Sequence, residues 1–213
     1  MNFDEFLVSL SKIKNIPLPA EASQFKMSPP FRRELISRYK EAMKDAKRAG
    51  VLAMFYPNST NETHLVLILR KTYKGVHSAQ IGFPGGKFED DDETLKHTAI
   101  RETWEEIGVP EHQIKIVKQM TEVYIPPSNF YVQPFIGITE VTPKFMKQDE
   151  EVEDIVEVSL AHFLDENNVG NKLVATSYTE KIEVPAYVLN GHVVWGATAM
   201  MLSEIKDIIR AVL

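Results

Sequence analysis

Three glutamates between residues 102 and 106 have the type and the spacing to bind a metal ion. Glu102, Glu105 and Glu106 stand at positions i, i+3 and i+4, so a helix would place them on one face. Their charges repel one another, and a hard divalent cation is the usual compensation. Because these ligands offer only oxygen, and the chain has no cysteine, we expect Mg²⁺ or Mn²⁺ rather than zinc. The alternative is an ordinary solvated acidic helix, because such charge patterns are common on exposed helices.

The residues around the glutamates favour the metal site. A glycine pair ending at Gly86 is followed by an acidic run, Arg101 directly precedes Glu102, and Gly108 ends the expected helix. Read from Gly86, the pattern G-x6-E-x7-R-E-T-W-E-E-I-G-V resembles the Nudix box, the signature of the Nudix hydrolases. Counted to Glu93, the interval after the glycine is one residue longer than in most Nudix boxes.

A second motif upstream narrows the resemblance to one branch of that superfamily. The segment L-I-L-R that ends at Arg70, followed by H-S-A-Q-I-G-F-P-G-G-K-F-E over 77–89, is similar to the signature of the coenzyme A pyrophosphatases. That branch also tolerates the longer interval and a small side chain at Thr103. Ala79 stands where the branch usually has glycine, and Leu69 replaces a threonine. The chain is therefore interpreted as resembling the coenzyme A pyrophosphatases.

The resemblance implies a metal site and its supporting residues. Glu102 and Glu106 are expected to bind the metal directly, with Glu105 close behind. A backbone carbonyl near Gly86 would be a further ligand. Arg101 is expected to orient a catalytic or metal-binding carboxylate, although a plain surface ion pair is the alternative. We thus expect Glu102, Glu105 and Arg101 to take part in catalysis, with Mg²⁺ or Mn²⁺ activating a water.

The resemblance also implies substrate contacts outside the box. Arg70, His77, Phe83 and Lys87 are expected to bind substrate. Each has a plainer interpretation: Arg70 as a surface charge, His77 as a hydrogen-bonding loop residue, and Phe83 as part of a rigid loop entry. A general base could be a box glutamate or Glu151, which lies in an acidic segment that is otherwise expected to be solvated.

Hydrophobic periodicity indicates the elements that must position these residues. Helices are expected over 3–13, 31–48 (ending at Gly50), 94–107 and 197–212, with an irregular connection over 16–30 and a helical turn over 161–165. Strands are expected over 51–55, 64–70, 114–124, 131–139, 153–158, 172–176 and 182–189. Asn129 stands at a usual glycine position of the branch, and asparagine accepts a positive φ there.

These elements predict an α/β protein of the α+β type. The resemblance implies a mixed β-sheet sandwiched between helices, over roughly residues 48–213, preceded by an N-terminal helical segment over 1–47. The 213 residues are enough for one sizeable core. The net charge of −6 argues against a nucleic-acid backbone as partner. No signal peptide or membrane span is evident, so we expect a cytoplasmic protein. The expected partner is a small-molecule nucleotide, and the expected state is a monomer or homodimer.

The expected reaction is hydrolysis of a nucleoside diphosphate linkage. The resemblance implies coenzyme A or acyl-CoA as substrate, giving adenosine 3′,5′-bisphosphate and 4′-phosphopantetheine or its acyl form. A pyrophosphatase for ADP-ribose or another nucleotide sugar is the alternative within the enzyme class. A Nudix module that senses a nucleotide without cleaving it is the alternative from another class, and metal-dependent turnover would separate the two.

Overall fold

The computed structural model describes residues 1–72, 79–175 and 181–213. Its α-helices are α1 (Phe3–Leu10), α2 (Glu21–Gln24), α3 (Arg32–Arg38), α4 (Leu95–Ile107), α5 (Leu160–Leu164) and α6 (Gly196–Arg210). Its strands are β1 (Lys47–Pro57), β2 (Thr63–Arg70), β3 (Ile81–Gly82), β4 (Gly85–Lys87), β5 (Lys115–Gln119), β6 (Val123–Ile125), β7 (Phe130–Ile138), β8 (Val152–Ser159), β9 (Val169–Val174), β10 (Ile182–Leu189) and β11 (His192–Trp195). Short 3₁₀ turns join several of them.

Strand β1 lies at the centre of a mixed sheet. It pairs in parallel with β7, and antiparallel with β2 and β4. Strand β8 extends the sheet beyond β2, and β5 and β6 pair with β7. The expected mixed sheet is therefore confirmed.

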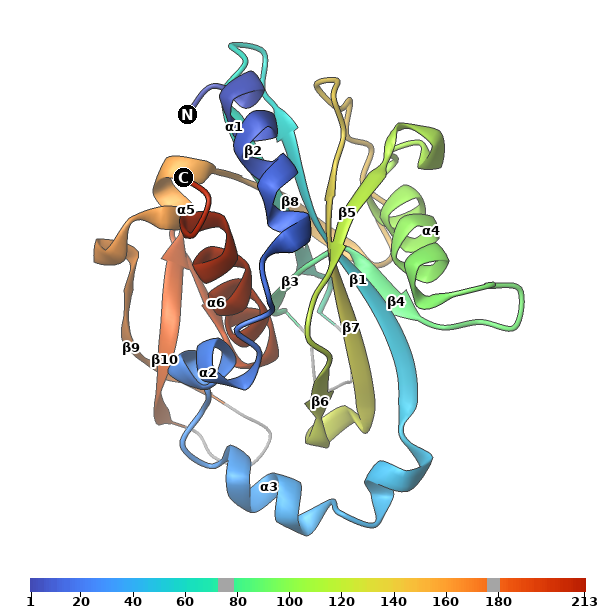
Figure 1. Cartoon of the computed structure of the whole chain (residues 1–213). Helices are drawn as coiled ribbons and strands as arrows, with labels where there is room; N and C mark the ends of the chain where they lie inside the picture. Colours follow the sequence, from blue (N-terminus) through green and yellow to red (C-terminus); the bar gives the residue numbers. More distant parts are fainter. Residues whose placement is uncertain (73–78, 176–180) are drawn as a thin grey trace.

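Both faces of this sheet pack against an apolar core. The side chains of a strand alternate between the two faces, so one strand can contribute to both cores. In β1, Leu52, Met54 and Tyr56 face a core that includes Ala99 and Ile107 of α4. The intervening residues face the larger core, to which α1 and α6 contribute. Figure 1 shows α4 on one side of the sheet, with α6 and α1 on the other. The predicted sandwich of helices around a sheet is confirmed.

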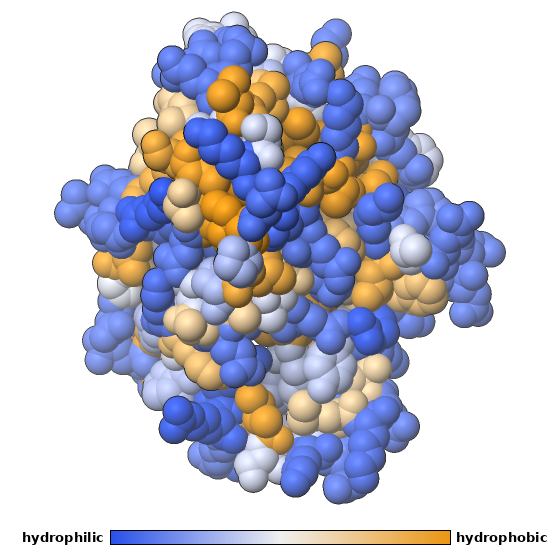
Figure 2. All heavy atoms as spheres, viewed as in Figure 1, coloured by the Kyte–Doolittle hydropathy of each residue, from blue (hydrophilic) through white to orange (hydrophobic). Residues whose placement is uncertain are grey.

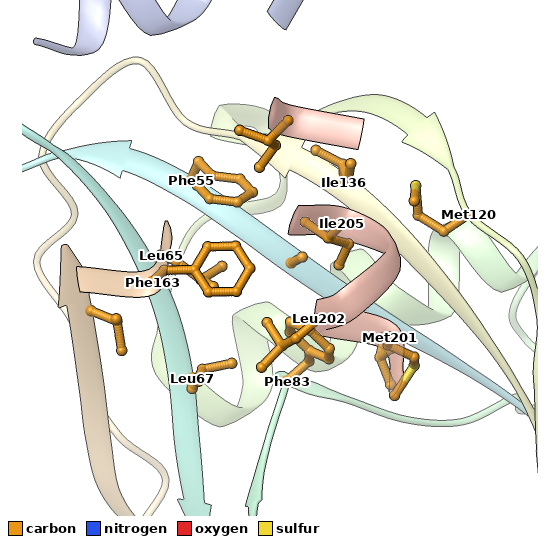
Figure 3. Packing of buried hydrophobic residues seen from close by; sticks show 14 of the residues in the cluster. Phe55, Leu65, Leu67, Phe83, Met120, Ile136, Phe163, Met201, Leu202 and Ile205 are labelled. Carbon is orange, nitrogen blue, oxygen red and sulfur yellow. The ribbon is translucent and has the colours of Figure 1, made fainter. Parts of the chain in front are cut away.

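The larger core joins segments far apart in the sequence. Figure 3 shows Phe83, next to the glycine pair, directed toward Met201 and Leu202 of α6. Phe55 of β1 and Ile205 of α6 belong to the same cluster. The loop that leads into the box is therefore held by the C-terminal helix.

A three-stranded sheet, ordered β11-β10-β9, packs against α6. Strand β11 was not expected from the sequence. Its hairpin with β10 pairs Leu189 with His192 across the two-residue turn Asn190-Gly191, and both turn residues have positive φ. Asn-Gly is a strong signal for such a hairpin, so the strand could have been predicted.

The expected helix over 31–48 is wrong in its second half. Helix α3 ends at Arg38, a 3₁₀ turn covers Ala42–Asp45, and β1 already begins at Lys47. Gly50 does not end a helix but lies inside β1, where a Cβ would collide with the carbonyl oxygen of Leu95. The glycine therefore lets α4 cross closely over the strand. The connection over 16–30, expected to be irregular, contains the short α2.

The N-terminal segment is anchored on the rest of the molecule by a buried carboxylate. Glu204 of α6 is fully buried and accepts hydrogen bonds from the backbone N–H of Ala20, from Gln24, and from the N–H and hydroxyl of Thr121. Phe3 and Phe6 of α1 are part of the larger core. The segment therefore shares its core with the sheet.

Polar residues cover the periphery of the face shown in Figure 2, and apolar side chains gather in its upper half. Within the described ranges, no helix has both the length and the apolar character needed to cross a bilayer.

Candidate functional site

Helix α4 carries the three glutamates and is fixed at both ends. Thr94 caps its N-terminus by accepting a hydrogen bond from the N–H of His97 at 3.2 Å. Gly108 ends it with a φ of 75°, as expected for a C-terminal glycine. The loop over 145–151 crosses this end, and its Gln148 donates a backbone N–H to the carbonyl of Glu106 at 2.9 Å.

Glu106 is the most buried of the three glutamates, with 2% of its surface exposed. Its Oε2 accepts the N–H of Gly85 at 2.8 Å, and its Oε1 lies 3.4 Å from Nη1 of Arg70. Burial raises the pKa of Glu106 to about 7, and the charges of Glu102 and Glu151 act in the same direction. Arg70 and the Gly85 amide oppose this rise. Through its contacts with Gly85 and Arg70, Glu106 links α4 to the glycine loop and to β2.

Glu102 packs against the glycine loop itself. A Cβ at Gly86 would overlap the Glu102 carboxylate, so any larger residue there would displace this carboxylate. Burial raises the pKa of Glu102, with Arg101 opposing and Glu105 assisting. Glu105, in contrast, is 45% exposed at its side chain. The structure thus places Glu102 and Glu106 against β4, while Glu105 is turned toward Arg101.

Arg101 holds the acidic loop and two of the glutamates together. Its Nε and Nη2 each donate to the carboxylate of Asp92 at 2.9 Å. Its Nη1 lies 2.9 Å from Glu105 and 3.1 Å from Glu102, and its Nη2 also reaches the Lys87 carbonyl at 3.2 Å. The Asp92 pair raises the pKa of Arg101, and the Arg101 guanidinium holds the pKa of Asp92 well below its usual range.

Asp92 was not singled out from the sequence, where the interval was counted to Glu93. In the structure, Glu93 is exposed and Asp92 is buried beside Arg101. Asp92 also accepts the N–H of Glu89 and the hydroxyl of Thr98. Nothing in a run of five acidic residues distinguishes its third aspartate, so only the fold identifies it.

The chemistry of the donors fits a hard divalent cation, because the groups that converge here are carboxylate and backbone oxygens. Burial and mutual repulsion raise the pKa of Glu102 and Glu106, which is the electrostatic condition that a cation relieves. In residues 1–72, 79–175 and 181–213, however, no three acidic or histidine side chains already form a metal-holding group. The carboxylates are instead turned toward Arg101, Arg70 and the Gly85 amide.

Glu151 is brought to the same face by the loop that follows residue 145. A groove of about 500 Å³ is lined by Glu105, Glu106 and Glu151, together with Trp104 and Gln148. The carbonyl of Glu151 accepts the N–H of Lys71, and its own N–H is held by the Gln148 side chain. Its neighbours do not share this position, because Glu153 pairs with Lys71 and Glu150 does not line the groove.

A second cavity, of about 370 Å³, lies next to the glycine pair and is mostly apolar. It is lined by three of the predicted substrate-binding residues, Arg70, Phe83 and Lys87, and by Gly86. His77, the fourth predicted substrate contact, lies outside the described residues. Residues of α3, of β7 and of the start of α6 complete the walls. No short motif could have indicated this assembly, since its parts come from several separate segments of the chain.

Two residues that replace family glycines have the backbone geometry of glycine. Ala79 has a φ of 55°, and Asn129 has a φ of 53° and a ψ of 51°. The left-handed geometry expected at Asn129 is therefore confirmed. The Asn129 side chain also accepts a hydrogen bond from the Tyr124 hydroxyl at 2.8 Å, which fixes the loop beside the cavity.

Comparison with known proteins agrees with this geometry. The NUDIX domain family model matches residues 46–176. Over 128 residues, the chain is 30% identical to human mitochondrial coenzyme A diphosphatase NUDT8, covering 60% of this chain and 54% of that protein. The mouse protein of the same name is also 30% identical, and the match covers 61% of its length. The chain therefore spans less than two thirds of the length of these two relatives. The Nudix hydrolase NudL of Yersinia pestis (strain Pestoides F) is 29% identical over 155 residues, covering 68% of this chain and 72% of NudL.

Solved structures agree at the level of the fold. The Nudix hydrolase RenU from M. smegmatis has a TM-score of 0.54 at 15% identity, covering 79% of this chain and 88% of that one. A MutT/nudix family protein from Enterococcus faecalis has a TM-score of 0.51 at 11% identity, covering 96% and 74%. With the family model matching more than half of the residues, and with the box folded as a loop and helix around Arg101, the chain belongs to the Nudix family.

Proposed function

We propose that this protein is a metal-dependent pyrophosphohydrolase that cleaves the diphosphate of coenzyme A or an acyl-CoA. The observation that carries the proposal is the position of Arg70. This arginine contacts Glu106 on the acidic face and also lines the mostly apolar cavity. A substrate in that cavity would therefore present its diphosphate beside the carboxylates.

The acidic residues have distinct roles in this proposal. Glu102, Glu105 and Glu106, with a carbonyl at Gly86, would hold Mg²⁺ or Mn²⁺. When bound, such an ion neutralises diphosphate oxygens and lowers the pKa of a water. Arg101 keeps Glu102 and Glu105 in place, because it is itself fixed by Asp92.

Proton transfer and anion binding fall to other side chains. Glu151 lines the groove beside Glu105 and Glu106, so we assign it the general base that accepts the proton of the attacking water. Arg70 and Lys87 line the cavity next to the glycine pair, where they would attract the diphosphate. Phe83 lines the cavity and would contact an uncharged part of the substrate.

Coenzyme A is favoured as substrate by the names of relatives, since the two mammalian relatives at 30% identity are called coenzyme A diphosphatase. The cavity beside the acidic face is mostly apolar but is also lined by Arg32, Arg70 and Lys87, which suits a nucleoside that carries phosphates. Products would be adenosine 3′,5′-bisphosphate and 4′-phosphopantetheine, or its acyl form. ADP-ribose or another nucleotide sugar remains the alternative substrate, and a nucleotide sensor the alternative without turnover.

A substrate panel tests the proposal. Purified protein is incubated with coenzyme A, acetyl-CoA, ADP-ribose and a nucleotide sugar, each with Mg²⁺, with Mn²⁺ and with EDTA. We expect coenzyme A to be cleaved fastest, and only with metal. Faster cleavage of ADP-ribose would refute the substrate, and nucleotide binding without any product would support the sensor instead.

Three further expectations stay predictions. They are the cytoplasmic location, the monomeric or homodimeric state without nucleic-acid or membrane partners, and the boundary between residues 47 and 48. The boundary lies close to the start of the family match at residue 46, while the segment before it packs into the common core.

A further inference from the structure

One wall of the cavity comes from a part of the chain that the family match does not include. Helix α3 lies in residues 1–45, outside the match over 46–176. Its residues Arg32 and Leu35, with Phe31 directly before it, line the same cavity as Arg70 and Lys87. Figure 1 shows α3 well away from α4, at the end of the N-terminal segment that runs from α1 through α2. The cavity therefore has a second charged end, distant from the acidic face.

Arg32 is a polar residue in an apolar wall. Its Nη2 donates to the carbonyl of Tyr124 at 2.8 Å, which orients the guanidinium. Its Nε is buried and has no hydrogen-bond partner among the described residues. Burial lowers the pKa of Arg32, and the charge of Glu21 only partly opposes this. The side chain thus lacks both an acceptor for one N–H and a full compensating charge.

The rest of the N-terminal segment holds this wall in place. Glu204 binds Ala20 and Gln24, as described above, and Ser203 donates to the carbonyl of Ser23 at 2.8 Å. Lys26 forms an ion pair with Asp207 at 2.6 Å. These contacts fix the chain directly before α3, so that Arg32 is pre-positioned at the cavity rather than free to turn into solvent.

We propose that Arg32 recognises a phosphate monoester of the substrate, at the end of the cavity away from the scissile diphosphate. A phosphate monoester supplies the missing acceptor and the missing negative charge together. A neutral amide carbonyl would supply only the acceptor, which is why we favour the phosphate. The proposal rests on the proposed function, and it predicts that the protein distinguishes coenzyme A from dephospho-CoA, which lacks the 3′-phosphate.

The kinetic test compares the two substrates across matched variants. Values of kcat/KM for coenzyme A and dephospho-CoA are measured for the wild type, Arg32→Gln, Arg32→Lys and Arg33→Gln. Arg33 is the control, because it carries the same charge on the same helix but is exposed and does not line the cavity. We expect the wild type and Arg33→Gln to prefer coenzyme A by about tenfold or more. Arg32→Gln should lose that preference through KM, and Arg32→Lys should keep part of it.

The ratio of the two substrates is insensitive to partial misfolding, which lowers both rates alike. An equal fall for both substrates in Arg32→Gln, or an unchanged preference, would overturn the assignment. A preference that persists in Arg32→Gln would place phosphate recognition elsewhere.

A binding measurement separates this proposal from the proposed function. Isothermal titration with adenosine 3′,5′-bisphosphate and with 5′-AMP is carried out in EDTA, so that no turnover is needed. We expect the bisphosphate to bind the wild type more tightly, and the difference to disappear in Arg32→Gln but not in Arg33→Gln. If coenzyme A is not cleaved but this pattern holds, only the proposed function fails. If the wild type does not distinguish the two nucleotides, the Arg32 proposal fails whatever the enzyme cleaves.

Discussion

The acidic face of α4 and the cavity beside β4 are neighbours, but different interactions build them. The acidic face is a network of ion pairs and hydrogen bonds around Arg101, Asp92 and Glu106. The cavity is mostly apolar, and its charged residues, Arg32, Arg70 and Lys87, come from segments far apart in the sequence. The two regions meet at Arg70 and the glycine pair. This division predicts that chemistry and substrate selection can be altered separately.

The largest expected effect is on the acidic face. Glu106→Gln should lower kcat by about a hundredfold or more, because it removes a charged metal-type ligand while keeping a similar shape. Steady-state assays with coenzyme A and Mg²⁺ measure the loss. Glu111→Gln, an exposed glutamate shortly after α4, is the control and should match the wild type. Full activity in Glu106→Gln would show that the acidic face does not carry the chemistry.

Asp92→Asn should loosen Arg101, which holds Glu102 and Glu105, without changing the three glutamates themselves. The substitution breaks a buried pair with Arg101, so we expect a loss of about 3 kcal/mol in the free energy of unfolding. Urea unfolding at neutral pH measures it, with the exposed Asp91→Asn as control. A loss no greater than that of Asp91→Asn would contradict the role given to Asp92.

The same pair predicts a dependence on pH. The pKa of Asp92 is lowered in the folded protein, chiefly by its hydrogen bonds with Arg101. Its contribution to stability is therefore complete above the pKa of an unfolded aspartate, about 3.9. It is lost as the pH falls from there through the lower folded pKa. The stability difference between wild type and Asp92→Asn should shrink below about pH 4, and a constant difference would contradict the ion pair.

Glu204→Gln tests whether the N-terminal segment supports the cavity rather than the acidic face. The amide cannot accept all the hydrogen bonds that the carboxylate accepts from Ala20, Gln24 and Thr121. We expect a loss of about 1 to 3 kcal/mol in stability and a raised KM for coenzyme A, with kcat nearly unchanged. A fall in kcat at constant KM would mean that the N-terminal segment supports the acidic face instead.

The smallest expected effect concerns the end of α4. Gly108→Ala places a Cβ at a φ of 75°, about 3.0 Å from Met146, and should cost about 1 to 2 kcal/mol. Gly170→Ala is the control, because its Cβ would meet no atom within 4 Å. Equal melting temperatures for the two variants would contradict the strain at Gly108.

These regions also differ in how far the sequence predicted them. The acidic face was largely predictable, because its residues follow one another within one loop and one helix, and helical spacing places Glu102, Glu105 and Glu106 near each other. Asp92 was missed because the fold decides which carboxylate of the acidic run is buried and pairs with Arg101.

The cavity could be predicted only in part. Arg70, Phe83 and Lys87 were expected from a motif, whereas Arg32 was not, since nothing in the sequence of an N-terminal helix indicates which wall it will form. The error at Gly50 has a similar cause, because a glycine that admits a crossing helix looks the same in sequence as one that ends a helix.

Product analysis shows whether the protein hydrolyses the diphosphate of coenzyme A with the help of a metal ion. Wild-type protein is incubated with coenzyme A and Mg²⁺ in ¹⁸O-labelled water, and the products are identified by mass spectrometry. We predict adenosine 3′,5′-bisphosphate and 4′-phosphopantetheine, with one ¹⁸O atom in one of the two product phosphates and no products in EDTA. Binding of coenzyme A without cleavage of its diphosphate, or cleavage that is unaffected by EDTA, would contradict it.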